Sequence, residues 1–336
     1  DFCFEWEWYG KMIGAFFIFI SINGKTEHDL FISIFHSISA FCNAGFSTFS
    51  DNLYDVSIRD NYFFQLSIAF LIIIGGIGFP VIINAITILN HFFRKNFNLF
   101  IGKKQKYQYI PNIVNVNTII VVKTTIILLI IATSLFFITE YNSTLMKDFS
   151  LKEKIITSFF MSVTPRTAGF NTFDMNLLSS SSVFIMILLM WIGASPGSTG
   201  GGIKTSTFTL AFLNVINTIR GKEKIEVNNR EIAYISFQKS YAVIFTSILV
   251  LFIGITLVII FEPQAGLKQI IFECFSALGT VGLSLNFTPT TCMETRLVLF
   301  SLMFIGRVGM IAILTNFIKP TETKRYSLPK ENILIN

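Results

Sequence analysis

The sequence predicts an all-α membrane protein built from one helical unit that occurs three times. Hydrophobic residues make up 52% of the 336 residues and charged residues only 14%, whereas a soluble globular chain carries about 25% charged residues. Several apolar runs reach the ~20 residues that a helix needs to cross a bilayer. A short Gly-centred motif recurs along the chain, and recurrence of this kind indicates a repeated structural unit.

The long apolar runs are the predicted membrane helices. They cover residues 2–22, 63–88, 116–138, 183–191 continuing past a break, 241–261 and 297–317. The loops that are rich in Lys and Arg are expected in the cytoplasm, because positive loops are retained on that side.

A shorter amphipathic segment precedes each Gly-centred motif. These segments span residues 29–42, 152–164 and 266–278. Apolar stretches of 10–14 residues are too short to cross a bilayer and are often re-entrant. Each unit is therefore predicted to contain a long helix, a short pore helix, an extended strand and a second long helix.

The three motifs predict strands that bind a cation through backbone carbonyls. Selectivity filters replace the hydration shell of an ion with carbonyl oxygens, and glycine reaches the backbone angles that aligned carbonyls require. A pore helix adds partial negative charge at its C-terminal end. We call these segments the filter strands, with candidate ion-binding residues Asn43, Ala44, Gly45, Phe46, Thr167, Ala168, Gly169, Phe170, Thr280, Val281, Gly282 and Leu283. The alternative is that the glycines only pack membrane helices.

The net charge of +6 comes from Lys and Arg residues that are concentrated in the loops, so it does not indicate a nucleic-acid interface. We expect an N-terminal unit at 1–92, a basic cytoplasmic loop at 93–115 and a central unit at 116–217. A second basic loop at 218–239, a C-terminal unit at 240–318 and a cytoplasmic tail at 319–336 complete the expected organisation. Nucleic acid is not an expected partner, whereas membrane lipid is.

Residues 195–205 interrupt the second helix of the central unit, and we call them the gate loop. Pro196 removes a backbone donor and the glycines that follow oppose helix formation. Unwound backbone at membrane depth borders a water-filled path or buried protein. The candidate gate residues are Gly197, Ser198, Thr199, Gly200, Gly201 and Gly202. A flexible packing kink is the alternative. A phosphate-binding loop fits poorly, since Ile203 separates Gly202 from Lys204.

Arg307 places a positive charge within the last predicted membrane helix. A charge at the centre of such a helix costs ~2.5–3.5 kcal/mol on insertion scales, so its side chain must face water, a partner or the pore. A structural salt bridge is the alternative to a role in the pore.

Residues 36–47, 164–171 and 277–284 together resemble the pore loops of the Trk/Ktr/HKT superfamily of potassium and sodium transporters. The resemblance covers essentially the whole chain. It implies four repeats around a pseudo-fourfold ion pore, of which this sequence holds the second, third and fourth. We expect a fragment of a longer protein, with a separately encoded first repeat as the alternative. In the superfamily the gate loop and an Arg at the place of Arg307 lie below the filter.

The same resemblance implies potassium uptake across the plasma (inner) membrane by a multi-pass protein that is not an enzyme. K⁺ is the expected ion at the filter carbonyls, with Na⁺ as a candidate coupling ion. It also implies a homodimer and a cytoplasmic nucleotide-binding regulatory subunit. Sodium or non-selective cation transport, and a non-conducting fragment, remain alternatives, because the first pore loop influences selectivity in the superfamily.

Overall fold

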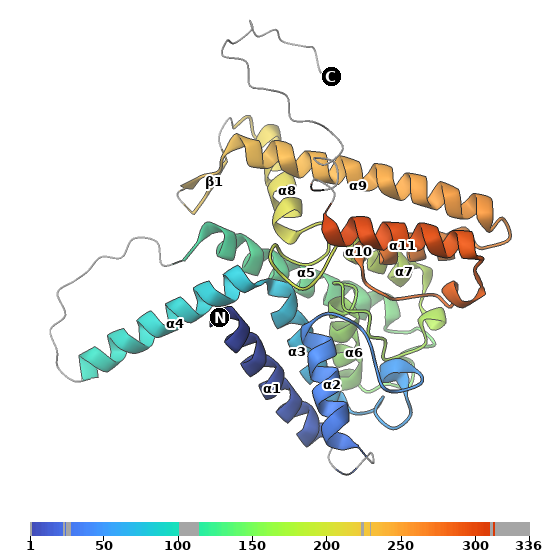
Figure 1. The fold of residues 1–336 in the computed structure, drawn as a ribbon, viewed down its shortest axis with the longest axis horizontal. Coiled ribbons are helices and arrows are strands. Elements are labelled where there is room, and N and C mark those ends of the chain that lie inside the picture. The colour runs from blue at the N-terminus through green and yellow to red at the C-terminus, as the bar shows by residue number, and fades with distance from the viewer. Residues whose placement is uncertain are drawn as a thin grey trace, which may run out of the picture.

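The computed structural model describes residues 2–22, 24, 28–100, 114–222, 225–228, 230–309 and 312. These residues are mostly helical (Figure 1), which confirms the predicted all-α fold. A two-stranded antiparallel hairpin joins β1 (Glu226–Val227) to β2 (Arg230–Glu231). The tail at 319–336 and most of the first basic loop lie outside the described residues.

The N-terminal unit contains two helices that pack against a shorter one. Helix α1 (Phe2–Ile22) lies beside the pore helix α2 (Asp29–Phe41) and beside α3 (Tyr62–Ile77). The side chain of Asn61 caps α3 by accepting a hydrogen bond from the Phe64 backbone N–H. Helix α4 (Phe79–Phe100) follows α3 after a single residue.

The central unit repeats this order with a broken second helix. It consists of α5 (Val116–Glu140), the pore helix α6 (Leu151–Val163), α7 (Ser180–Trp191) and α8 (Thr205–Ile219). At the start of α6, Ser150 and Glu153 each accept a hydrogen bond from the other's backbone N–H, which forms a capping box.

The C-terminal unit has the same succession of elements. Helix α9 (Tyr234–Phe261) packs against the pore helix α10 (Leu267–Gly279) and against α11 (Met293–Val308), beside which it lies in Figure 1. A 3₁₀ turn precedes the second helix in every unit, at Asn52–Tyr54, Met175–Leu177 and Thr288–Thr290. The predicted pore helices therefore all occur close to their expected positions.

The prediction of one continuous helix at 63–88 is wrong. Helix α3 ends at Ile77, Gly78 adopts φ 96°, and α4 leaves at 98° to α3. The run predicted at 297–317 is likewise interrupted, because α11 ends at Val308 and Gly309 also adopts φ 96°. Glycine permits this left-handed backbone without a Cβ clash, so a glycine ends the second helix in both outer units.

Two boundaries also differ from the sequence interpretation. Helix α4 continues to Phe100, into the segment expected as a loop, and α9 begins at Tyr234, before the expected boundary at 240. Within the described residues, α5 and α9 are long and apolar enough to cross a membrane, and α3 with α4 forms a third span if the bent pair is counted as one. These lengths fit a multi-pass membrane protein.

Carboxylates join the long helices at one end of the central and C-terminal units. Glu140 Oε1 accepts hydrogen bonds from the backbone N–H (3.1 Å) and hydroxyl (2.7 Å) of Ser179, which caps α7. In the same way, Glu262 Oε1 accepts from the backbone N–H of Cys292 at 2.6 Å, just before α11. Each bond ties the end of a unit's first helix to the start of its second.

Candidate functional site

The three filter strands share one backbone conformation. Two positions before each central glycine, Asn43, Thr167 and Thr280 adopt positive φ angles of 50°, 65° and 51°. The glycines follow with φ of 72° at Gly45, 76° at Gly169 and 86° at Gly282. Non-glycine residues seldom adopt positive φ. Its recurrence at equivalent positions shows that the sequence repeat is also a structural repeat.

Neighbouring filter strands touch at their glycines. A Cβ atom at Gly45 would lie 2.6 Å from the carbonyl oxygen of Ala168, and one at Gly169 would overlap the carbonyl oxygen of Val281. Each glycine thus lies against the carbonyl that precedes the next unit's glycine. The absence of a side chain lets the Ala168 and Val281 carbonyls lie directly against the preceding strand.

The arc formed by these strands is open beside Gly282. Among the described residues, no atom lies within 4 Å of a Cβ placed on Gly282. The central strand is enclosed, with Phe170 fully buried, whereas Phe46 in the N-terminal strand is 69% exposed. The described residues therefore form an arc of three consecutive strands, with the central unit in the middle.

Pore-helix hydroxyls hold the end of each filter strand. Ser39 donates to the Phe46 carbonyl and Ser276 to the Leu283 carbonyl, both at 2.7 Å, and Thr164 donates to the Phe170 carbonyl. These carbonyls bond to their own pore helix. The carbonyls nearer the glycines are therefore the better candidates for ion ligands than those of Phe46, Phe170 and Leu283.

Polar contacts also connect the N-terminal and central strands. Asn43 Nδ2 donates to Thr167 Oγ1 at 3.2 Å and to the Arg166 carbonyl at 3.4 Å. The buried Arg166 side chain donates to Thr125 Oγ1 of α5 at 3.4 Å. Arg166 thus braces the central strand from behind.

The gate loop is folded against the break between α3 and α4. The Ser195 N–H donates to the Gly76 carbonyl, and the Phe79 N–H donates to the Gly197 carbonyl, both at 3.0 Å. Thr199 Oγ1 donates to the Gly75 carbonyl at 3.2 Å. The unwound backbone therefore has protein partners, as backbone at membrane depth requires.

Two gate-loop glycines lie directly against the filter threonines. A Cβ at Gly200 would overlap Oγ1 of Thr167, and one at Gly201 would overlap Oγ1 of Thr280. The structure therefore brings the predicted gate residues and two predicted filter strands into contact. Side chains at these glycines would displace either the loop or the strands.

Two cationic side chains bond to adjacent carbonyls of the gate loop. Arg307 Nη1 donates to the Thr199 carbonyl, and Lys204 Nζ donates to the Gly200 carbonyl at 2.7 Å. The expectation that Arg307 lies mid-helix is wrong, because α11 ends one residue later and the charge occupies the helix C-terminus, where the dipole favours a cation. Sequence reasoning assigned no role to Lys204, although it lies only two residues after the last glycine of the gate loop, Gly202.

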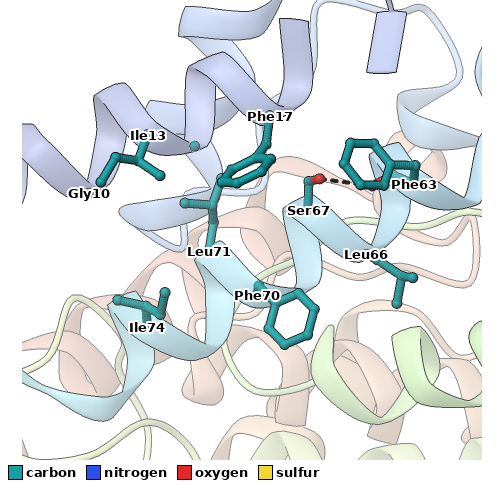
Figure 2. A pocket seen from close by; sticks show the side chains of 10 residues that line it. Gly10, Ile13, Phe17, Phe63, Leu66, Ser67, Phe70, Leu71 and Ile74 are labelled. Carbon is teal, nitrogen blue, oxygen red and sulfur yellow. Dashed lines mark hydrogen bonds between the residues drawn. The ribbon is translucent and has the colours of Figure 1, made fainter. Parts of the chain in front are cut away.

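A separate apolar groove of about 450 Å³ lies between α1 and α3 (Figure 2). Phe17 of α1 faces Leu71 of α3 across it, Ile13 and Phe70 also line it, and the Ser67 hydroxyl donates to the Phe63 carbonyl. This groove offers no charged group for an ion. Among the described residues, no three His, Cys, Asp or Glu side chains gather to hold a metal ion.

Comparison with known proteins identifies the family. A family model described as a cation transport protein, TrkH, matches residues 12–328. The chain belongs to the TrkH family of cation transport proteins. It is 37% identical over 295 residues to the Ktr system potassium uptake protein B of Bacillus subtilis, covering 88% of this chain and 61% of that protein.

A second relative and a solved structure are also similar to most of this chain. The chain is 31% identical over 311 residues to the potassium/sodium uptake protein NtpJ of Enterococcus hirae, covering 91% of this chain and 64% of that protein. Its fold resembles the crystal structure of the potassium transporter TrkH from Vibrio parahaemolyticus, with a TM-score of 0.68, 18% identity, and coverage of 93% and 63% of the two chains. The chain thus spans less than two thirds of the length of these relatives.

Proposed function

We propose that the protein takes up potassium ions across the cell membrane through a single-file pore lined by the filter strands. The close approach of the Ala168 carbonyl to Gly45 and of the Val281 carbonyl to Gly169 is the observation that carries this proposal. Similarity to relatives named as potassium uptake proteins supports it. In this function the carbonyl oxygens replace the water around a dehydrated cation.

The pore helices supply the electrostatic part of the site. Helices α2, α6 and α10 each end where their filter strand begins. The C-terminal end of a helix carries partial negative charge, equivalent to roughly half an elementary charge. Three such ends around the strands favour a cation without placing a carboxylate on the path.

We propose that the gate loop obstructs the path below the filter when the pore is closed. Its glycines lie against Thr167 and Thr280, so an ion leaving the strands meets the loop backbone. Arg307 and Lys204 hold this backbone by their hydrogen bonds and also repel a cation there. Opening then requires the loop backbone at Thr199 and Gly200 to give up both hydrogen bonds.

The protein is further proposed to form a homodimer and to bind a cytoplasmic nucleotide-binding regulatory subunit. Two relatives are named as the B and D proteins of a Ktr system, which supports assembly with further components. The basic segments 93–115 and 218–239 are the proposed docking face for such a subunit, and a purely topological role is the alternative.

Flux through reconstituted protein tests the proposed function. The whole protein in liposomes loaded with potassium buffer should take up ⁸⁶Rb⁺, and external K⁺ should compete far better than external Na⁺. Empty liposomes provide the background. Equal competition by Na⁺ would instead support the second candidate, a potassium/sodium transporter like the relative NtpJ. No uptake above background would contradict cation transport.

A further inference from the structure

The outer two filter strands are each tied to their pore helix by a hydrogen bond at equivalent positions. His36 and Glu273 both lie nine residues before the filter glycine, and Ser47 and Ser284 both lie two residues after it. His36 Nε2 is 3.0 Å from Ser47 Oγ, and Ser284 Oγ donates to Glu273 Oε1. We call these two pairs the strand clamps.

The surroundings of His36 fix how the first clamp bonds. His36 Nδ1 is 2.8 Å from the Ile32 carbonyl, which can only accept. The ring is fully buried, in contact with the rings of Phe49 and Phe64. A neutral imidazole with its proton on Nδ1 satisfies this environment. Its Nε2 then accepts from the Ser47 hydroxyl.

The second clamp uses a different chemical group for the same purpose. Glu273 belongs to α10 and is only 5% exposed. Ser284 joins it to the chain beyond the strand, because Ser284 Oγ also accepts from the Phe287 N–H at 3.3 Å. Ser47 makes the corresponding bond in the N-terminal unit, where its Oγ accepts from the Phe49 N–H at 3.1 Å.

The central unit has no such pair at these positions. Phe160 and Asn171 occupy them, and Asn171 donates instead to the Phe173 carbonyl at 3.3 Å. The central strand is enclosed between its two neighbours, whereas the other two strands each have an open side among the described residues. The clamps thus occur on the strands that have less support from neighbours.

We propose that His36 and Glu273 are positioning residues for the filter. Each holds the serine that directly follows its filter strand, and so fixes the angle at which the strand presents its carbonyls. This inference rests on the proposed potassium transport, because its consequence is selectivity. A loosened strand adapts to the smaller Na⁺, so breaking a clamp lowers the preference for K⁺ over Na⁺.

The test compares four variants of the whole protein in liposomes, with ⁸⁶Rb⁺ uptake competed by K⁺ or Na⁺. Ser284→Ala and Glu273→Leu should each lower the K⁺ preference about fivefold to tenfold, the scale of one lost hydrogen bond. Glu273→Gln keeps an acceptor for Ser284 and should retain most of the preference. Thr290→Ala is the matched control, since its hydroxyl bonds only within the adjacent turn, to the Phe287 carbonyl.

This set separates a clamp from an attraction of cations by the Glu273 charge. A charge effect predicts that Glu273→Gln weakens the apparent affinity for both ions while Ser284→Ala changes nothing. That result, or an unchanged K⁺ preference in Ser284→Ala, overturns the proposal.

Amide hydrogen exchange supplies a readout that needs no transport. Exchange at residues 280–287 should become faster in Ser284→Ala and stay unchanged in Thr290→Ala, whereas equal exchange in both overturns the clamp. If wild-type protein shows no rubidium uptake, the proposed function fails, and the exchange result alone then decides whether the strand is held as inferred.

Discussion

Gly169 shows most clearly what a single residue contributes to the site. It lies in the enclosed central strand, with φ 76° and with the Val281 carbonyl where a side chain would begin. Two costs of substitution therefore combine there. The left-handed backbone disfavours any L side chain by about 1–2 kcal/mol, and the Cβ atom would enter the group of carbonyls that the ion is proposed to meet.

We expect Gly169→Ala to reduce rubidium uptake at least about tenfold, because the added methyl group displaces the carbonyl oxygen of Val281. Gly221→Ala is a matched control, since Gly221 also adopts a positive φ, 64°, but a Cβ atom placed on it would meet no described residue within 4 Å. Uptake is measured in liposomes at equal protein content. Similar losses in both variants would show that backbone strain, and not the carbonyl contact, is responsible.

The sequence predicted these glycines because the motif occurs three times, and a turn needs glycine wherever φ is positive. It could not predict the direction of single carbonyls. The bonds from Ser39 and Ser276 to the Phe46 and Leu283 carbonyls depend on how each pore helix packs against its strand, which the sequence pattern does not show. The role of Lys204 was not visible for the same reason, because its partner is a backbone carbonyl, which every residue has.

At the scale of elements, the interrupted second helices bring the gate loop against the filter strands. Helix α7 ends at Trp191, α3 ends at Ile77, and α11 ends at Val308. The loop that follows α7 occupies the space that these ends leave, and Arg307 reaches it from the end of α11. Hydropathy predicted the apolar runs but not the breaks at Gly78 and Gly309. A single glycine hardly changes the mean hydropathy of a stretch long enough to cross a membrane.

Removing a gate-loop contact should increase ion flux. Arg307→Ala and Lys204→Met each delete a hydrogen bond to the loop and a repelling charge, so we expect uptake to rise about threefold to tenfold. Lys123→Met is the control, because Lys123 is exposed on α5. The initial rate of ⁸⁶Rb⁺ uptake is the measurement. Wild-type rates in both variants would contradict the proposed role of the loop.

The contact between Glu140 and Ser179 should stabilise the central unit. Glu140→Ala leaves the Ser179 N–H and hydroxyl without this acceptor, and we expect a loss of about 1–3 kcal/mol in the free energy of unfolding. Thermal unfolding in detergent measures the change. Asp148→Ala, at an exposed position, should leave the unfolding temperature unchanged. A Glu140→Ala protein as stable as wild type would show that the bond contributes little.

At the scale of the whole molecule, the three units form consecutive members of an arc of filter strands. Gly45 lies against the central strand and Gly169 against the C-terminal one, whereas the described residues leave the side of Gly282 open. The repeat spacing predicted that the units are alike. Their order around the pore depends on contacts between units, such as that of Asn43 with Thr167, which no local pattern encodes.

The location of a bound ion tests the central claim most directly. Crystals of the whole protein grown with Tl⁺ or Rb⁺ would reveal the ion by anomalous scattering. We predict a peak beside the carbonyl oxygens of Ala168 and Val281, next to the three filter glycines. A peak confined to other parts of the molecule, with none at these carbonyls, would contradict the account.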